Sequence, residues 1–322
     1  MNLYVQYKLK TCGKSKFLTR LIPELDRQGV KVQFEEKGAD VALLITRCRG
    51  KFPKIPTVVR LDGITLLDTK KDRERLKNKI RPGVNKCDAI IYQSEFCKRM
   101  LNGILKPKVK KQYVIFNGAN IQDYFVKPAE SDKLQNVLIS SKWFDGKNFR
   151  YHKRLREMWE VAVEYCSMYS GDTKFWIAGE TGGEEKHWPK HDSIEFLGHL
   201  DSLTLKRYYV LCDVMLYLAW YDWCPNQVIE VLCAGVPVVC NNNGGVPEIV
   251  KNNGIICNID VMMPTKRIAS NMPPAFNRLT VLENLRDVLH SPPNLDIWHV
   301  NIRNVAKQYK KSFKEVLSGK LD

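Results

Sequence analysis

The segment from Asp222 to Val250 constrains the fold of this chain more than any other. An irregular loop that contains Pro225 leads into an apolar stretch, and this stretch predicts a helix over Gln227–Ala234. Gly235 follows, and glycine is the usual residue just past a helix end. A β-branched run then begins after Val236-Pro237 and is typical of a buried strand. A loop, a helix and a buried strand in this order indicate one αβ unit of a parallel sheet.

Two carboxylates flank the start of the predicted helix. Asp222 lies in the loop, and Glu230 lies about one turn into the helix. The free N–H groups at a helix N-terminus bind anions. A carboxylate further along can accept hydrogen bonds from a pair of sugar hydroxyls, as in dinucleotide folds. An anion site beside a ribose site indicates a nucleotide ligand; the alternative is an ordinary αβ unit with two incidental acids.

The rest of the chain repeats this alternation of apolar runs and amphipathic stretches. Strands alternating with helices predict parallel sheets, here in two Rossmann-like halves joined by a polar connector at 127–133. The predicted strands are Leu3–Tyr7, Val41–Ile45, Thr57–Leu61, Ala89–Tyr92, Tyr113–Phe116, Val137–Ser140, Phe175–Ala178, Ile194–Phe196, Val214–Leu218, Val236–Cys240 and Gly254–Cys257. The predicted helices are Lys16–Gln28, Asp72–Lys86, Glu95–Leu105, Lys153–Met168, Ser202–Cys212, Gln227–Ala234 and a tail over Leu285–Leu317 that is helix-prone apart from Ser291-Pro-Pro.

Length and composition narrow the class of protein. A chain of 322 residues with 44% hydrophobic residues fits two globular domains. It has no run of 18 apolar residues, and its first residues resemble a strand instead of a signal peptide. Ten cysteines are scattered without a Cys-x-x-Cys pair, which indicates reduced, non-ligating thiols. We therefore expect a cytoplasmic protein, with peripheral association at a membrane as an added expectation.

The positive charge is concentrated in the first half. Residues 1–130 carry 28 Lys and Arg against 13 Asp and Glu, a net charge of +15, whereas residues 131–322 carry 23 against 22. An excess of this size favours a polyanionic partner for the first half. The alternative is generic solubility from solvated lysines.

The segment that begins at Asp222 also carries a resemblance to a known family. Asp222, seven residues, Glu230, then Pro237-Val-Val and Gly244-Gly-Val-Pro-Glu, resembles the C-terminal signature of retaining glycosyltransferases of family 4. The family pattern is Glu, seven residues, Glu, so Asp222 is shorter than the family acid by one methylene. The resemblance implies the α/β GT-B fold, in which two Rossmann-like domains face each other across a cleft. The implied domains are an acceptor domain at 1–130, a nucleotide-sugar domain at 131–302, and a last helix at 303–322 that packs back on the first domain.

The resemblance also implies which residues hold the donor's diphosphate. Ser140-Ser-Lys-Trp143 follows the first predicted strand of the second half, and Arg150-Tyr-His-Lys153 opens the next helix. In relatives, a Lys at the helix start and a basic residue before it bind the diphosphate. Here Lys153 fits the first role, with Arg150 as the first choice and Lys142 as the second choice for its partner. Fixed cations stabilise charge on a departing diphosphate; the alternative is a solvated basic face.

Other donor contacts follow from the same resemblance. Glu230 would hold the ribose, and Asp222 with the backbone of Pro225, Asn226 and Gln227 would position the donor sugar. The backbone around Gly198, His199 and Leu200 would contact the nucleobase, with His199 in a structural or base-stacking role instead of that of a catalytic base.

Two further candidates lie in the first half. Gly13 lies in a loop, Lys10–Lys16, that follows the first predicted strand; Lys8 occupies the position where a P-loop requires Gly, so the Walker pattern fails. The resemblance places this loop near the donor diphosphate or the acceptor. Arg60 and Asp62 end a predicted strand, and Asp62 would lie near the reacting sugar; a structural salt bridge at a turn is the alternative.

The implied activity is a metal-independent hexosyl or pentosyl transfer with retention, from a donor such as a UDP- or GDP-sugar as co-substrate and with no cofactor. The chain has no Asp-x-Asp pair and no His/Cys cluster with ligand spacing. For the acceptor we favour a lipid-linked or surface glycan at an anionic membrane face. The alternatives are a modified base in nucleic acid and, third, a non-catalytic module that binds a nucleotide sugar or nucleic acid.

Overall fold

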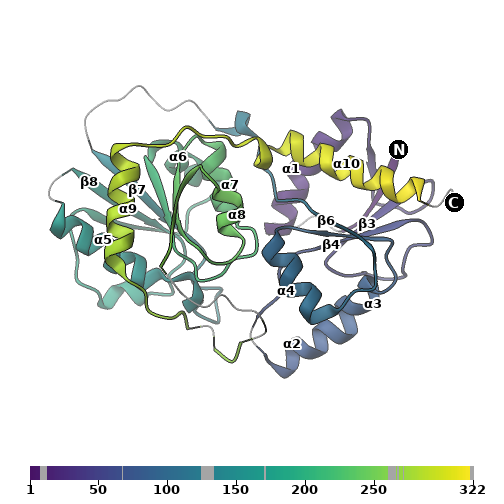
Figure 1. The fold of residues 1–322 in the computed structure, drawn as a ribbon, viewed down its shortest axis with the longest axis horizontal. Coiled ribbons are helices and arrows are strands. Elements are labelled where there is room, and N and C mark those ends of the chain that lie inside the picture. The colour runs from purple at the N-terminus through teal and green to yellow at the C-terminus, as the bar shows by residue number, and fades with distance from the viewer. Residues whose placement is uncertain are drawn as a thin grey trace. The chain divides into compact units, whose positions relative to one another are not determined.

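The chain forms two compact α/β units, seen here in a computed structural model (Figure 1). The structure describes residues 1–7, 13–66, 68–124, 134–169, 172–259, 266, 268–270 and 272–319, with only the backbone for 13–15. The first unit comprises Met1–Asn120, Pro264–Ser270 and Trp298–Asp322, and the second comprises Ile121–Met263 and Asn271–Ile297. The predicted connector at 127–133 and the loop at 8–12 lie outside the described residues.

The first unit is built on a parallel sheet of six strands. The strand order is β2-β1-β3-β4-β5-β6, and every pair in it is parallel. β3, β4 and β5 are buried along their whole length, as expected for apolar strands that are covered on both faces. The strands are β1 (Asn2–Gln6), β2 (Lys31–Gln33), β3 (Val41–Ile45), β4 (Thr57–Leu61), β5 (Ala89–Tyr92) and β6 (Lys111–Val114).

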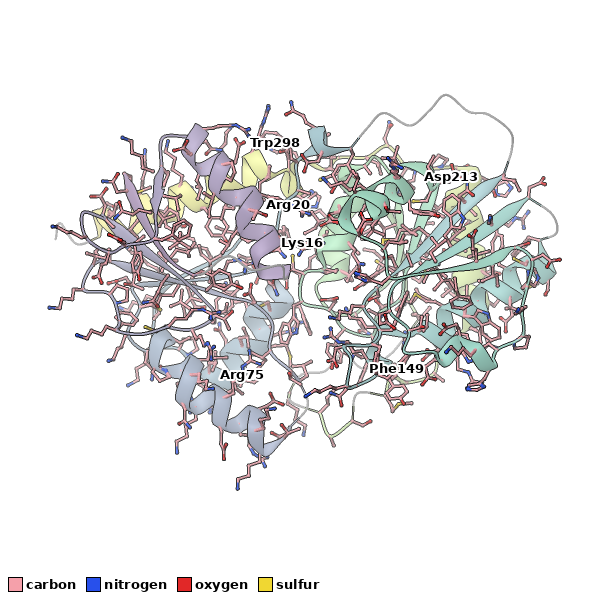
Figure 2. All side chains as sticks on the ribbon, turned by 180° about the vertical axis from the view of Figure 1, so that it is seen from behind. Lys16, Arg20, Arg75, Phe149, Asp213 and Trp298 are labelled. Carbon is pink, nitrogen blue, oxygen red and sulfur yellow. The ribbon has the colours of Figure 1, made fainter. Side chains whose placement is uncertain are left out.

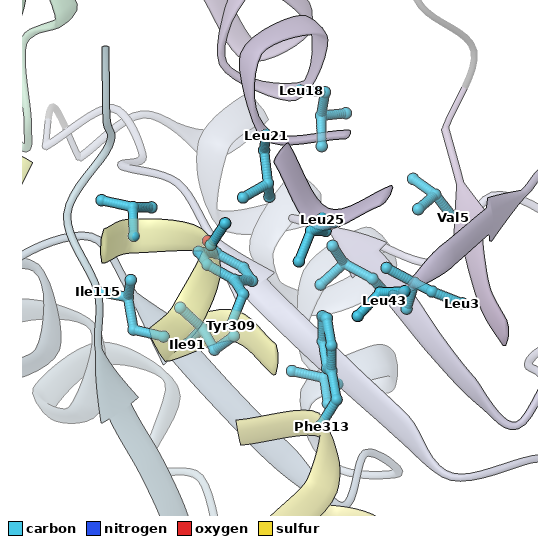
Figure 3. Close-up of a cluster of buried hydrophobic side chains, with 14 of the residues drawn as sticks. Leu3, Val5, Leu18, Leu21, Leu25, Leu43, Ile91, Ile115, Tyr309 and Phe313 are labelled. Atoms are coloured by element: carbon cyan, nitrogen blue, oxygen red, sulfur yellow. The ribbon is translucent and has the colours of Figure 1, made fainter. Parts of the chain in front are cut away.

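Helices from both ends of the chain cover this sheet. The last helix, α10, lies beside α1 (Figure 1). Its Tyr309 and Phe313 point into the same cluster as Leu21, Leu25 and Ile91, which come from α1 and the sheet (Figure 3). The helices are α1 (Gly13–Arg27), α2 (Lys70–Arg75), a π-helical turn η1 (Leu76–Ile80), α3 (Arg81–Val84), α4 (Glu95–Leu105) and α10 (Ile302–Ser318).

The second unit repeats the design with a different strand order. Its six parallel strands run β12-β11-β10-β7-β8-β9, which is the dinucleotide-fold order 3-2-1-4-5-6 read from its other edge. The strands are β7 (Gln135–Ser140), β8 (Thr173–Ala178), β9 (Ile194–Gly198), β10 (Val214–Tyr217), β11 (Val238–Asn241) and β12 (Gly254–Cys257). The helices are α5 (Leu155–Met168), α6 (Ser202–Leu211), α7 (Asn226–Cys233), α8 (Val246–Val250) and α9 (Arg278–His290). Short 3-10 turns lie at η2 (Ile121–Asp123), η3 (Tyr151–Lys153) and η4 (Glu184–His187), and a further turn, η5 (Trp298–Val300), belongs to the first unit.

The predicted α/β class with two parallel sheets is confirmed, and the element boundaries differ at a few places. The predicted helix over Lys153–Met168 begins at Leu155, because Arg154 adopts a left-handed conformation with φ +52°. The predicted tail over Leu285–Leu317 is helical on both sides of Ser291-Pro-Pro, as expected: α9 ends at His290 and α10 begins at Ile302. The short strand β2 and the helix α8 were not predicted.

Among the described residues, no helix is both long and apolar enough to cross a membrane.

The packing of α10 gives a stability prediction for the first unit. Phe313 is fully buried, so Phe313→Ala leaves a cavity and lowers the free energy of unfolding by about 3–5 kcal/mol. Its neighbour Lys314 is exposed, so Lys314→Ala changes it by less than about 0.5 kcal/mol. Urea unfolding followed by circular dichroism measures both. Equal losses for the two variants would contradict the packing of α10 on this core.

Candidate active site

The candidate site lies at the carboxyl ends of β7 and β10, where the strand order of the second sheet reverses. Chains leave neighbouring strands in opposite directions at such a point, and ligands of open α/β sheets bind in the crevice that results. Ser140 ends β7 and Tyr217 ends β10, and these strands pair directly. Gln227 Nε2 donates a hydrogen bond of 2.9 Å to Ser140 Oγ, which ties the start of α7 to this edge.

Lys153 and Asp222, both predicted site residues, form an ion pair here. The Tyr217 hydroxyl is 3.0 Å from Lys153 Nζ and 2.7 Å from Asp222 Oδ2. The Trp223 N–H donates to Asp222 Oδ1 at 2.7 Å. Sequence reasoning missed Tyr217 because it reads as an ordinary residue of a buried strand.

The charge of Asp222 follows from these contacts. Burial alone would raise the pKa of Asp222, but the Lys153 ammonium and the hydrogen bonds from Lys153, Tyr217 and Trp223 outweigh burial and lower it below its usual value. Burial, and then the neighbouring Asp222 carboxylate, raises the pKa of Tyr217 well above its usual value. The carboxylate is therefore ionised, and the phenol keeps its proton.

His152 joins the two site loops next to this ion pair. Its ring stacks on Tyr221 with centroids 4.6 Å apart and planes 8° from parallel. Its carbonyl accepts a hydrogen bond of 2.8 Å from the Trp220 N–H. Burial, followed by the charge of Lys153, lowers the pKa of His152 to about 3, so the ring is neutral near pH 7.

The turn that carries Lys153 is fixed from both sides. The Trp143 indole Nε1, which is fully buried, donates to the Lys153 carbonyl at 3.3 Å. Arg154 is buried, its Nη2 donates to the Pro274 carbonyl at 2.8 Å, and its guanidinium lies 4.7 Å from the Phe276 ring centroid. These contacts hold Lys153 in the turn η3 instead of at the start of α5, and sequence reasoning missed both Trp143 and Arg154.

The two basic candidates before this turn differ in their surroundings. The segment between Phe144 and Phe149 folds back on itself through an antiparallel bridge, and Arg150 follows it. Arg150 Nη2 lies 3.5 Å from Asp145 Oδ2, and its charge acts on both Tyr217 and His152. Lys142 is exposed just after β7.

The loop of Asp222 is held by the Gly244-Gly245 pair of the family signature. The Gly245 N–H donates to the Asp222 carbonyl at 2.7 Å. Gly244 has φ +75°, and a Cβ placed on it would lie 2.7 Å from the Asp222 backbone nitrogen. Only glycine fits such a close backbone approach in this conformation.

The start of α7 places the remaining donor candidates of this segment together. Pro225 precedes the helix, Asn226 and Gln227 form its first turn, and Glu230 lies one turn further. Glu230 is 6% exposed, so its carboxylate is largely shielded from water.

Gly198, His199 and Leu200 lie at another edge of the same sheet. Gly198 ends β9 with φ +62°, and its carbonyl accepts a 2.7 Å hydrogen bond from the Gly179 N–H. His199 is exposed. The nucleobase contact predicted for this segment stays a prediction.

Asp62, the candidate of the first unit, belongs to a buried polar network. It forms an ion pair with Arg60 and accepts a hydrogen bond of 2.8 Å from Thr46 Oγ1. Arg60 also donates to Asn117 Oδ1, and its guanidinium lies 4.3 Å from the Phe17 ring centroid. The salt bridge considered from the sequence is thus present, and the role of Asp62 near the reacting sugar stays a prediction. Gly13, the other candidate, begins α1.

Within the described ranges, His, Cys, Asp and Glu side chains form no group of three or more that could share a metal ion.

Comparisons with known proteins give this geometry a context. Residues 147–269 match the family model described as Glycosyl transferases group 1. N-acetyl-alpha-D-glucosaminyl L-malate synthase of Bacillus anthracis is 24% identical over 230 residues, which cover 68% of this chain and 58% of that protein. O-antigen chain mannosyltransferase B of Escherichia coli is 28% identical over 102 residues, which cover 30% of this chain and 25% of that protein. The chain thus matches less than two thirds of the length of either relative.

Solved structures share the fold over nearly the whole chain. Sucrose-phosphate synthase from Thermosynechococcus elongatus superposes with a TM-score of 0.63 at 14% identity, over 99% of this chain and 97% of that chain. Anabaena Alr3699/HepE in complex with UDP-glucose superposes with a TM-score of 0.58 at 13% identity, over 98% and 99%. The chain therefore has the two-domain α/β fold of GT-B glycosyltransferases, and the group 1 match falls almost wholly on the unit that contains the candidate site.

The neutral His152 gives a pH prediction. Between about pH 6.5 and about pH 3, His152 is protonated in the unfolded chain and neutral in the folded chain. The free energy of unfolding therefore falls as the pH falls through this range. His152 alone changes the free energy of unfolding by at most about 1.4 kcal/mol per pH unit. Urea unfolding at pH 7, 6 and 5 should show a shallower slope in His152→Gln, whereas His187→Gln, at an exposed position, should keep the wild-type slope. An unchanged slope in His152→Gln would contradict burial of a neutral ring.

Proposed function

We propose that this protein is a retaining glycosyltransferase that uses a nucleotide-sugar donor. The observation that carries the proposal is the Lys153–Asp222–Tyr217 network at the switch point of the second sheet, beside the start of α7. A lysine ammonium together with the first N–H groups of a helix would bind a phosphate group, which supports the proposal. The match to the group 1 family model over 147–269 supports the same assignment.

In the proposed reaction the bond between the donor's anomeric carbon and the diphosphate oxygen breaks, and the diphosphate leaves with the electron pair. An acceptor hydroxyl oxygen then bonds to the same face of the anomeric carbon and gives its proton to the departing diphosphate oxygen. Lys153 and Arg150 stabilise the charge that develops on the diphosphate, which is electrostatic catalysis by groups already in place. Glu230 holds the ribose, the backbone of 225–227 positions the sugar, and neither a metal nor a cofactor takes part.

The donor side is tested by nucleotide release. A panel of UDP- and GDP-sugars is incubated with the protein, and free UDP or GDP is measured. Lys153→Met should lower kcat by about 100- to 1,000-fold because it removes charge stabilisation in the transition state. Glu230→Gln should raise the KM for the donor about ten-fold, since it weakens charge-assisted hydrogen bonds to the ribose.

The matched control is Lys174→Ala, because Lys174 lies on β8 and pairs with Glu195 at the surface. This variant should turn over the donor at the wild-type rate. Donor turnover that survives both Lys153→Met and Glu230→Gln would reject the proposed site. A wild-type protein that binds nucleotide sugars without releasing nucleotide would favour the non-catalytic module.

For the acceptor we propose a lipid-linked or surface glycan at an anionic membrane face, with the basic first unit against the lipid. Cations are dense on the segment formed by α2, η1 and α3, whose side chains project outward around the labelled Arg75 (Figure 2). The exposed cations over residues 70–86 are Lys70, Lys71, Arg73, Arg75, Lys77, Lys79, Arg81 and Lys86. A surface of this charge attracts anionic lipid headgroups. It would equally attract the phosphates of nucleic acid, which keeps a modified DNA base as the alternative acceptor.

Retention on vesicles separates the two acceptors. We expect the protein to sediment with vesicles of phosphatidylglycerol but not of phosphatidylcholine, and to be released as salt approaches about 0.5 M because salt screens surface charge. The triple variant Lys71→Glu, Lys77→Glu, Lys79→Glu should lose this retention. The control triple variant, with Lys174, Lys186 and Lys190 of the second unit replaced by Glu, should still be retained on the vesicles. Salt-sensitive binding to duplex DNA without binding to anionic vesicles would favour the nucleic-acid acceptor.

A further inference from the structure

Tyr217 has a position that the proposed reaction leaves unexplained. It is the last residue of β10, and 1% of it is exposed. Its hydroxyl lies between the Lys153 ammonium and the Asp222 carboxylate, 3.0 Å from Nζ and 2.7 Å from Oδ2. A phenol has one proton and an accepting oxygen. Because this phenol keeps its proton, it donates to the carboxylate and accepts from the ammonium at the same time.

The hydrogen bonds of Asp222 leave its carboxylate turned toward Lys153. Oδ2 accepts from Lys153 Nζ and from the Tyr217 hydroxyl, and Oδ1 accepts from the Trp223 N–H. The aspartate side chain is one methylene shorter than the glutamate at this place in the family pattern. Its backbone is also fixed, because Gly245 donates to its carbonyl and Gly244 packs on its nitrogen. Because its backbone and its carboxylate are both held, this short side chain has little freedom to move toward a donor sugar.

Lys153, by contrast, keeps a donor for a ligand. An ammonium has three N–H groups. Among the described side chains, Asp222 and Tyr217 take two of them. The side chain is 11% exposed, so it is ordered by burial yet reachable from solvent. The Tyr217 ring also lies beside the ammonium, 5.5 Å from Nζ to the ring centroid.

We propose that Tyr217 is a positioning residue that joins Asp222 to Lys153, so that Asp222 acts on the donor's diphosphate through Lys153 and does not contact the donor sugar. The inference rests on the proposed function, since it needs a diphosphate at Lys153. A lysine side chain has four rotatable bonds, and ordering it for a ligand costs conformational entropy. Fixing the ammonium beforehand removes that cost from donor binding.

The first test measures affinity for UDP and GDP by calorimetry in Tyr217→Phe. This variant keeps the ring and removes only the hydroxyl. We expect about ten-fold weaker binding of the nucleotide that the wild type binds, because the hydroxyl's hydrogen bonds to the Asp222 carboxylate and the Lys153 ammonium are lost. In a Lys153→Met background the same change should alter affinity by less than about two-fold, since the side chain that Tyr217 positions is gone.

Tyr165→Phe is the matched control. Tyr165 is a buried tyrosine of α5 whose hydroxyl bonds to Thr173 in the core of the same unit. Its loss should lower the melting temperature about as much as Tyr217→Phe does, without changing nucleotide affinity. If Tyr217 had only a structural role, Tyr217→Phe and Tyr165→Phe would have similar melting temperatures and similar nucleotide affinities.

The second test asks whether Asp222 touches the sugar. UDP is compared with UDP-glucose, and GDP with GDP-mannose, in wild type and Asp222→Asn. If Asp222 acts through Lys153, the substitution changes the affinities for the bare nucleotide and the nucleotide sugar by the same factor. A change confined to the nucleotide sugar would overturn the inference and return Asp222 to a sugar contact.

The failures of the two proposals are distinguishable. A wild-type protein that binds neither UDP nor GDP overturns the proposed function, and the inference with it. A wild type that binds one of them, with Tyr217→Phe equal to wild type in affinity, overturns only the positioning role.

Discussion

The ion pair between Lys153 and Asp222 is the interaction on which the candidate site depends. It joins two segments 69 residues apart in the sequence, and both charges are largely removed from water. A charge pair in such a place persists only when further hydrogen bonds satisfy it. Tyr217 and the Trp223 N–H supply them, and the His152–Tyr221 stack closes the same junction. The Lys153 turn and the Asp222 loop therefore form one preorganised body.

The parallel sheets explain why polar groups gather where they do in each unit. In the second unit, β7 and β10 deliver their carboxyl ends to the switch point, and the site loops start there. In the first unit, Thr46 follows β3, Asp62 follows β4 and Asn117 follows β6. Arg60, on β4, connects Asp62 and Asn117. In each unit, the strand order therefore determines which polar side chains come together.

Much of the fold could be predicted from the sequence, and the reasons are local. Apolar runs such as Val41–Ile45 and Ala89–Tyr92 are buried strands at the predicted bounds, because strands covered on both faces tolerate few polar residues. The three-residue strand β2, which contains no buried residue, has no such run. The helix start at Leu155 was missed because it follows a left-handed Arg154, whose side chain contacts Pro274 and Phe276, and these are distant in sequence. The family pattern brought Lys153 and Asp222 into consideration, but their pairing through Tyr217 needs the register of β10 against β7, which periodicity does not encode.

We propose that the second unit holds the nucleotide of the donor at the Lys153 turn and the start of α7. Amide hydrogen exchange with and without saturating UDP, and separately GDP, tests it most directly because it reports on every segment at once. We expect one of the nucleotides to slow exchange in peptides that cover Tyr151–Lys153 and Asn226–Cys233, while peptides from the sheet of the first unit exchange as before. Unchanged exchange in both segments with either nucleotide, or protection confined to the first unit, would contradict the account.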